Sequence, residues 1–202
     1  MKRRWIALFL SSLCAVTACA CLHLQTQQQA LASHMIRLHV VANSDDPYDQ
    51  ALKLQVRDAV LAEAKRATAG ETDPKKALAE HMDAICDAAQ MTLLANGCAD
   101  SVTVRLGKEL FPTRAYESFC LPAGVYESLR VSIGNAEGHN WWCVVFPSLC
   151  MAASSQELVQ AAQAAGFSDG QIRLITEAND TYVVKFKVLE LLGQLKNFFW
   201  DA

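Results

Sequence analysis

The most unusual segment of this 202-residue chain covers residues 138–143 and reads GHNWWC, which places a histidine, two tryptophans and a cysteine close together. His139 and Cys143 are the residue types of a general base and a cysteine nucleophile. On a strand, residues four apart share one face but lie roughly 13 Å from each other along it. A nucleophile and its base need a hydrogen bond of about 3 Å. This distance argues against a catalytic pair. We keep a cell-envelope cysteine hydrolase using Cys143 and His139 as the alternative to a protein without an active site.

The cysteines favour a structural use of Cys143. Of the eight cysteines, three lie in the first 24 residues, and the other five are Cys86, Cys98, Cys120, Cys143 and Cys150. A turn at Pro147 would bring Cys143 to Cys150, so we predict a disulfide between them in an exported protein. The odd number leaves at least one thiol free or paired between chains. No CxxC pair occurs outside the N-terminal segment, so we expect no structural metal site.

The acidic residues that follow the first predicted strand are explained by helix capping. Asn43, Asp45 and Asp49 surround the sequence Asp46-Pro47, in which Asp46 can cap a helix and Pro47 suits its first position. The spacing lacks the distal Glu of a calcium loop. No second carboxylate is matched to them as in a glycosidase, and no GxSxG, HExxH, P-loop or dinucleotide fingerprint occurs. We therefore predict no catalytic residue, cofactor, metal or small-molecule substrate.

The two adjacent tryptophans predict an interaction surface. On a strand, Trp141 and Trp142 point to opposite faces, so one can enter the core while the other lies on the second face. A partly exposed Trp suits a partner-binding anchor, because it offers a large apolar body and one donor. We place the surface on the loop before the tryptophans and on the start of the first helix. Its predicted residues are His139, Asn140, Trp141, Trp142, Asn43, Asp45 and Asp49.

The N-terminal 32 residues read as an export signal or membrane anchor. Three basic residues at positions 2–4 precede about twenty uncharged residues. Three fates stay open: cleavage after Ala32, retention as an anchor in contact with the membrane, or lipidation at Cys19. In each case the basic end stays inside and the rest of the chain is exported.

The remainder, residues 33–202, is long enough for a single domain. Without the three N-terminal basic residues it carries 15 basic against 21 acidic residues and no basic tract, which argues against nucleic acid as a partner.

Hydrophobic periodicity predicts an α+β domain of order β-α-α-β-β-β-α-α, with helices packed on a mostly antiparallel sheet. We expect the sheet-containing core at about residues 35–150 and a helical C-terminal part at 151–202. Helices are expected from Asp46, from Asp73 to Gly97 and from Ser154 to Gly166. A further apolar stripe covers residues 184–199. The expected strands are 35–42, 102–106, 129–133 and 140–146, with 115–121 as a weaker candidate and a hairpin loop at 134–138.

Three blocks of this chain resemble the stage II sporulation protein R family. They are IRLHVVANSD at residues 36–45 followed by DQALKLQVRDAV at 49–60, LPAGVYESLRV at 121–131, and Gly134 followed by GHNWWCVVFPSLC at 138–150. Residues 152–202 match only loosely. Where the family often has Pro-Pro, this chain has Pro147-Ser148.

The resemblance implies an exported signalling protein that is not an enzyme. Such a protein is made in the forespore and exported into the space between the two membranes. There it activates a membrane-embedded aspartic protease, which processes the precursor of the early mother-cell sigma factor. The resemblance carries over no catalytic residue.

Overall fold

A computed structural model describes residues 2–151 and 154–176. The apolar stripe predicted at 184–199 lies outside the described residues. In chain order the elements are α1 (Lys2–Ala32), β1 (Ile36–Val41), α2 (Pro47–Thr68), α3 (Pro74–Glu80), α4 (Met82–Ala95), β2 (Val102–Phe111), β3 (Arg114–Ala115), β4 (Cys120–Leu121), β5 (Gly124–Ile133), β6 (Asn140–Phe146), the 3₁₀ turn η1 (Leu149–Met151), α5 (Ser155–Ala164) and α6 (Asp169–Thr176). The predicted α+β class is confirmed.

The main sheet has four strands in the order β2-β5-β1-β6, and β3 and β4 form a separate two-stranded ribbon. The central strand β1 runs parallel to β5 and antiparallel to β6, while β2 and β5 are antiparallel. The hairpin predicted around residues 134–138 was wrong, because β1 lies between β5 and β6 in the sheet. The prediction of a mostly antiparallel sheet was also wrong, since the sheet is mixed. The parallel pairing of β1 with β5 is possible because three helices and β2 lie between them in the chain. A parallel pair requires such a long crossover connection.

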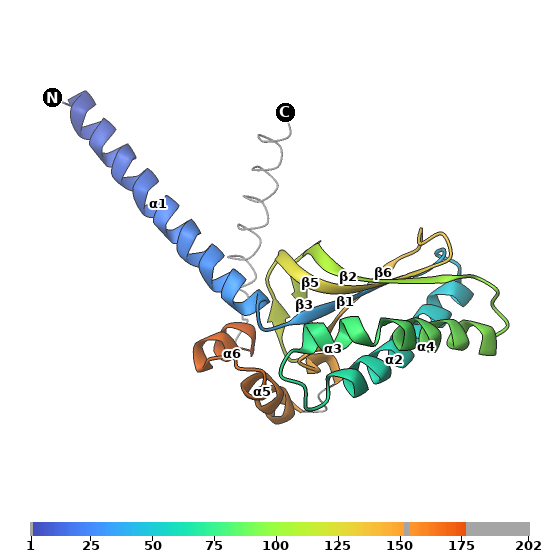
Figure 1. The fold of residues 1–202 in the computed structure, drawn as a ribbon. Helices are drawn as coiled ribbons and strands as arrows, with labels where there is room; N and C mark the ends of the chain where they lie inside the picture. The colour runs from blue at the N-terminus through green and yellow to red at the C-terminus, as the bar shows by residue number, and fades with distance from the viewer. Residues whose placement is uncertain (1, 152–153, 177–202) are drawn as a thin grey trace.

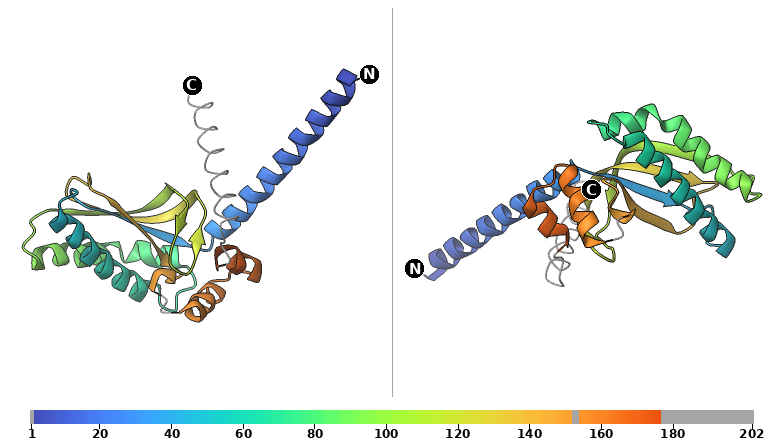
Figure 2. Two further views of the ribbon diagram at one scale, coloured as in Figure 1. Left: turned by 180° about the vertical axis from the view of Figure 1, so that it is seen from behind. Right: turned by 90° about the horizontal axis from the view of Figure 1, so that it is seen from below.

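Helices α2, α3 and α4 cover one face of this sheet (Figures 1 and 2). Local sequence explains where α2 and α3 begin: Asp46 accepts a hydrogen bond from the backbone N–H of Tyr48 at 2.9 Å, and Asp73 accepts one from Lys76 at 3.0 Å. The single helix expected from Asp73 is divided in two at His81. The main core lies between these helices and the sheet, where buried aliphatic residues of α2 and α4 meet inward-facing residues of β1, β5 and β6.

The opposite face of the sheet carries a second, more aromatic core. Phe111, Tyr126 and Val144 of the sheet pack here with Leu31 and Met35 and with apolar residues of the β3–β4 ribbon, α5 and α6. The long helix α1 runs away from the domain, and its C-terminal end meets this second core (Figure 1). Leu31 has no exposed surface, so the predicted cleavage position after Ala32 lies directly beside a buried residue. Among the helices within residues 2–151 and 154–176, none is both long enough and apolar enough to cross a membrane.

Candidate interaction surface

The residues predicted to bind a partner come from two segments that the fold places side by side. We call them together the loop–helix surface: residues 43–49, which join β1 to α2, and residues 134–142, the loop before β6 and its first strand residues. The backbone N–H groups of Glu137 and Gly138 donate to the carbonyls of Asn43 and Ala42 at 3.1 and 3.0 Å. The loop is thus fixed to the β1–α2 junction by its main chain.

Glycine is required where the two segments touch. A Cβ added to Gly138 would lie 2.2 Å from the carbonyl oxygen of Ser44, which is a backbone atom. Gly134 has φ +53°, and an added Cβ there would lie 2.3 Å from the side-chain oxygen of Asn43. That same oxygen accepts a hydrogen bond from the N–H of Asn135 at 2.9 Å. The glycines therefore permit the close approach that builds the surface.

Asp49 organises the junction from the first turn of α2. Its carboxylate accepts hydrogen bonds from the amide of Asn43 at 3.0 Å and from the hydroxyl of Ser44 at 2.6 Å. Two of the predicted residues, Asn43 and Asp49, are thus bonded to each other rather than directed at solvent. Their contribution to the surface is to hold its backbone in place.

His139 and Asp45 form the exposed polar part of the surface. The Nδ1 atom of His139 and the carboxylate of Asp45 are in contact, and the same carboxylate oxygen accepts from the backbone N–H of His139 at 2.7 Å. Burial acts to raise the pKa of Asp45, but the hydrogen bonds and charge of His139 outweigh it, so the pKa lies below its ordinary value. The side chains stay 76% and 58% exposed, so this pair is available to a partner.

A buried lysine supports the surface from below. Lys53 of α2 donates to the backbone carbonyl of His139 at 2.9 Å and to the side chain of Gln50 at 2.6 Å. Desolvation, and secondarily the charge of Arg57, lowers the pKa of Lys53, while Asp45 acts in the opposite direction. Lys53 therefore has a structural role, because it holds the loop carbonyl of His139 against α2.

The two tryptophans have different environments. Trp141 lies on the helix-covered side, 37% exposed, with the guanidinium of Arg57 4.5 Å from its ring centroid. Trp142 lies on the second face, stacked on His39 with ring centroids 3.7 Å apart and in edge contact with Phe111 at 4.8 Å. The prediction that the tryptophans point to opposite faces is confirmed. Trp141 is the more exposed of the two rings, and Trp142 packs mainly with the second core.

His39 is the centre of a polar network that sequence reasoning missed. Its Nδ1 atom lies 2.7 Å from a carboxylate oxygen of Glu109, and its Nε2 atom lies 2.6 Å from the side-chain oxygen of Asn140. Glu109 also accepts from Arg130 at 2.8 Å and from Ser128 at 2.9 Å. The alternation of β1 put His39 on the second face, but only the aromatic covering explains its burial. Asn140 thus connects the loop–helix surface to this network.

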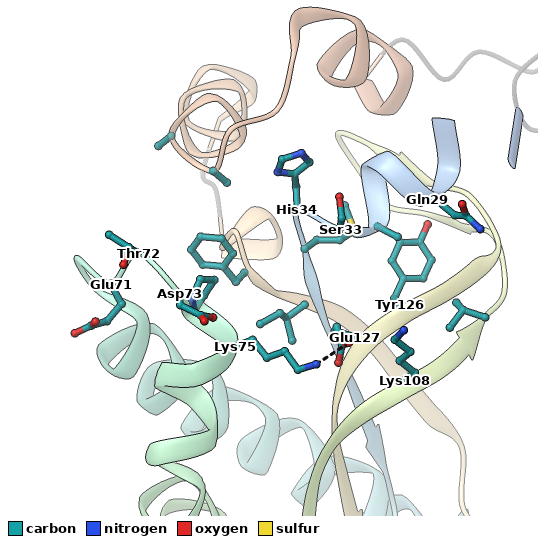
Figure 3. Close-up of a pocket in the computed structure, with 18 residues that line it drawn as sticks. Gln29, Ser33, His34, Glu71, Thr72, Asp73, Lys75, Lys108, Tyr126 and Glu127 are labelled. Carbon is teal, nitrogen blue, oxygen red and sulfur yellow. Dashed lines mark ion pairs between the residues drawn. The ribbon is translucent and has the colours of Figure 1, made fainter. Parts of the chain in front are cut away.

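A cavity of about 1060 Å³ lies at the other end of β1, between the end of α1 and the start of α3 (Figure 3). Lys75 and Glu127 form an ion pair across it at 2.8 Å. The Ser33 hydroxyl donates to the carbonyl of Ala30, and the ring of His34 packs on Phe167 at 5.6 Å. Ser33 and His34 are a potential nucleophile and base, but each contacts another group. The cavity therefore offers shape and charge and not an assembled catalytic pair.

The alternative hydrolase pair is not assembled either. His139 contacts Asp45, whereas Cys143 is buried with the main core and its thiol donates to the backbone carbonyl of Val144 at 3.8 Å. Cys143 and Cys150 are free thiols in the structure and near neighbours, so the predicted disulfide stays a prediction. Among the residues that the structure describes, no cluster of three or more His, Cys, Asp or Glu side chains could hold a metal ion.

Known proteins match this chain over the part that builds the loop–helix surface. The family model described as Stage II sporulation protein R matches residues 32–156. Stage II sporulation protein R of Bacillus subtilis (strain 168) is 37% identical over 130 residues, which cover 62% of this chain and 58% of that relative. The match therefore spans less than two thirds of the relative's length. No solved structure matches the chain.

Proposed function

The chain belongs to the stage II sporulation protein R family, and from this premise we propose that it is an exported signal between the two compartments of a sporulating cell. In this proposal it is made in the forespore and reaches the space between the two membranes. Its partner there is a membrane-embedded aspartic protease. Activation of the protease leads to processing of the precursor of the early mother-cell sigma factor.

The observation that carries the proposal is the family match over residues 32–156. It includes every residue of the loop–helix surface and both strands that support it. A signalling ligand needs a stable core and an exposed anchor, and it needs no active site. The exposed Trp141 with the polar pair His139–Asp45 beside it supports this use, because aromatic anchors rimmed by polar groups are typical of interaction hot spots.

The N-terminal segment supports export in the same proposal. Its basic residues at positions 2–4 and the uncharged run that follows are typical of a signal or anchor segment. We expect deletion of residues 2–24 to abolish signalling from the forespore. Full signalling by a cytoplasmic version would contradict the export step without affecting the family assignment.

Co-expression in a non-sporulating host tests the function directly. The full chain, the candidate protease and its precursor substrate are expressed together, and substrate processing is followed by immunoblot. We expect processing to require both the chain and the protease, and to be lost on Trp141→Ala. Met91→Ala is the matched control, because Met91 is an exposed apolar residue of α4 outside the loop–helix surface. Processing that is independent of the chain would contradict the proposal.

A further inference from the structure

The second face of the sheet carries a row of side chains that crosses all four strands. Arg105 of β2 is paired with Arg130 of β5, and Arg130 is paired with His39 of β1. His39 is paired in turn with Trp142 of β6. The guanidinium of Arg114, on the ribbon strand β3, lies 6.0 Å from the ring centroid of Trp142 and extends the row. We call these five residues the arginine row.

Both ends of the arginine row are open to solvent. Helices α5 and α6 lie beside the C-terminal end of α1, at one end of the sheet (Figures 1 and 2). Arg105 and Arg114 are exposed, and the side chain of Arg130 is 41% exposed. His39 is buried and Trp142 is partly buried, so they form the floor between the two ends. The guanidinium groups are therefore accessible on either side of an aromatic floor.

Glu109 is the single acidic residue that the four strands place on this face, and its carboxylate is occupied. One oxygen accepts a hydrogen bond from Arg130 at 2.8 Å and lies 2.7 Å from the Nδ1 atom of His39. The other oxygen accepts from the hydroxyl of Ser128 at 2.9 Å. This carboxylate therefore compensates Arg130 and has no free oxygen for another guanidinium.

Two further arginines on the same face have no carboxylate partner among the described residues. Arg105 lies directly opposite Arg130, where like charges repel each other. Arg37 is fully buried; its Nη2 atom donates to the hydroxyl of Tyr116 at 3.0 Å, and its Nε and Nη1 atoms have no hydrogen-bond partner. The excess of cations gives this face a positive potential, although the whole chain has a formal net charge of −3.

The length of the row indicates the kind of anion that it fits. Neighbouring strands lie about 4.8 Å apart, so the distance from Arg105 to Trp142 is about 14 Å, and Arg114 lies beyond. A single phosphate or carboxylate would reach only one end of this row. An extended peptide covers the same distance with about four or five residues, at about 3.3 Å each. Its carboxylates would meet guanidinium groups at both ends, and these groups match carboxylates in a bidentate geometry.

We propose that the arginine row binds an acidic segment of a protein partner, with carboxylates on Arg105 and Arg130 at one end and on Arg114 at the other. Trp141, the exposed ring of the loop–helix surface, lies on the helix-covered side of the sheet, so the arginine row is a second surface on the opposite face. This second surface goes beyond the proposed signalling function and does not depend on it.

The test measures binding of a fluorescein-labelled hexaglutamate peptide to the purified full chain by fluorescence anisotropy. We expect binding that weakens as salt is added, because salt screens exposed charges. Arg105→Gln and Arg114→Gln should each weaken it about tenfold, since each removes a charge-assisted hydrogen-bond donor. Arg66→Gln is the matched control, because it removes an exposed guanidinium from α2 on the other face of the sheet, and it should leave the affinity unchanged.

A charge reversal separates binding from folding. Arg105→Glu places an opposite charge across from Arg130, so it should abolish peptide binding while the melting temperature is kept. Absence of hexaglutamate binding, or equal binding by Arg105→Gln, overturns the proposal. A loss confined to Arg105→Gln would indicate a site for a single anion and would overturn the assignment to a peptide. Flotation with phosphatidylglycerol vesicles that depends on Arg105, without peptide binding, would assign the row to lipid and overturn it as well.

Discussion

Single substitutions of the two adjacent tryptophans should separate binding from folding. Trp142→Ala removes a ring that stacks on His39 and contacts Phe111, so it should cost about 3–5 kcal/mol of unfolding free energy. For a chain of this size about 2–4 °C of melting temperature is lost per kcal/mol, so we expect a fall of roughly 10 °C. Trp141→Ala removes a partly exposed ring and its cation–π contact with Arg57, which is worth about 0.5–1 kcal/mol.

The effect on protease activation should have the opposite order. Removing a hot-spot anchor typically costs about 2 kcal/mol of binding, which corresponds to roughly thirtyfold in affinity. Trp141→Ala should therefore keep its fold and lose most activation at limiting concentrations of the chain. The assays are thermal unfolding by circular dichroism and substrate processing in the co-expression host. If both variants lose stability and activation in parallel, or if Trp141→Ala activates normally, Trp141 is not the anchor.

Three further predictions concern stability. Gly138→Ala should destabilise the fold strongly, because an added Cβ would lie 2.2 Å from a backbone carbonyl oxygen. Gly107→Ala is its control in thermal unfolding, because a Cβ there meets nothing within 4 Å. Equal melting temperatures of the two variants would contradict the assigned contact. Leu31→Ala should cost about 2–5 kcal/mol in urea unfolding, since Leu31 is fully buried in the second core, and a neutral result would mean that the end of α1 does not dock there. Because the pKa of Asp45 is lowered in the folded chain, its contribution to stability is complete above the unfolded pKa near 3.8 and is lost as pH falls through the lower folded pKa. Asp45→Asn should remove this pH-dependent part of the unfolding free energy. Stability curves against pH that superimpose for the variant and the unaltered chain would refute it.

Features set by neighbouring residues could be predicted from the sequence. The caps at Asp46 and Asp73 are confirmed, and so is the cap at Ser154, which accepts a hydrogen bond from the N–H of Glu157 at 3.2 Å. The turn glycine Gly97 follows α4 with φ +74°, as expected of a helix stop. Each of these depends on residues within one turn of the helix, so the local sequence contains the necessary information.

Features set by distant residues could not be predicted. The alternation of β1 placed Arg37 and His39 on the second face but gave no reason for them to be buried. Their covering comes from Phe111, Trp142 and Tyr116, which lie about seventy or more residues further along the chain. The parallel pairing of β1 with β5 has the same origin, because periodicity within a strand does not determine its neighbour. The break between α3 and α4 at His81 lies within an uninterrupted apolar stripe, and nothing in the periodicity marks it.

For the candidate surface, sequence reasoning found the two segments but not their internal roles. It grouped all seven residues as partner contacts. The structure brings the segments together but turns Asn43 and Asp49 toward each other and Trp142 toward the second core. His139, Asp45 and Trp141 are the members that stay open to a partner. This division depends on the direction of each side chain in the tertiary structure.

The position of β1 at the centre of the sheet has a consequence for the order of folding. β1 is the first strand to be synthesised, yet both of its neighbours, β5 and β6, come from beyond the middle of the chain. Pairings between residues this far apart form late and slowly, because a long loop must close before they contribute. The sheet therefore cannot be completed before residue 146 is available to it. A chain built in this way keeps its central strand unpaired until most of the domain has been synthesised.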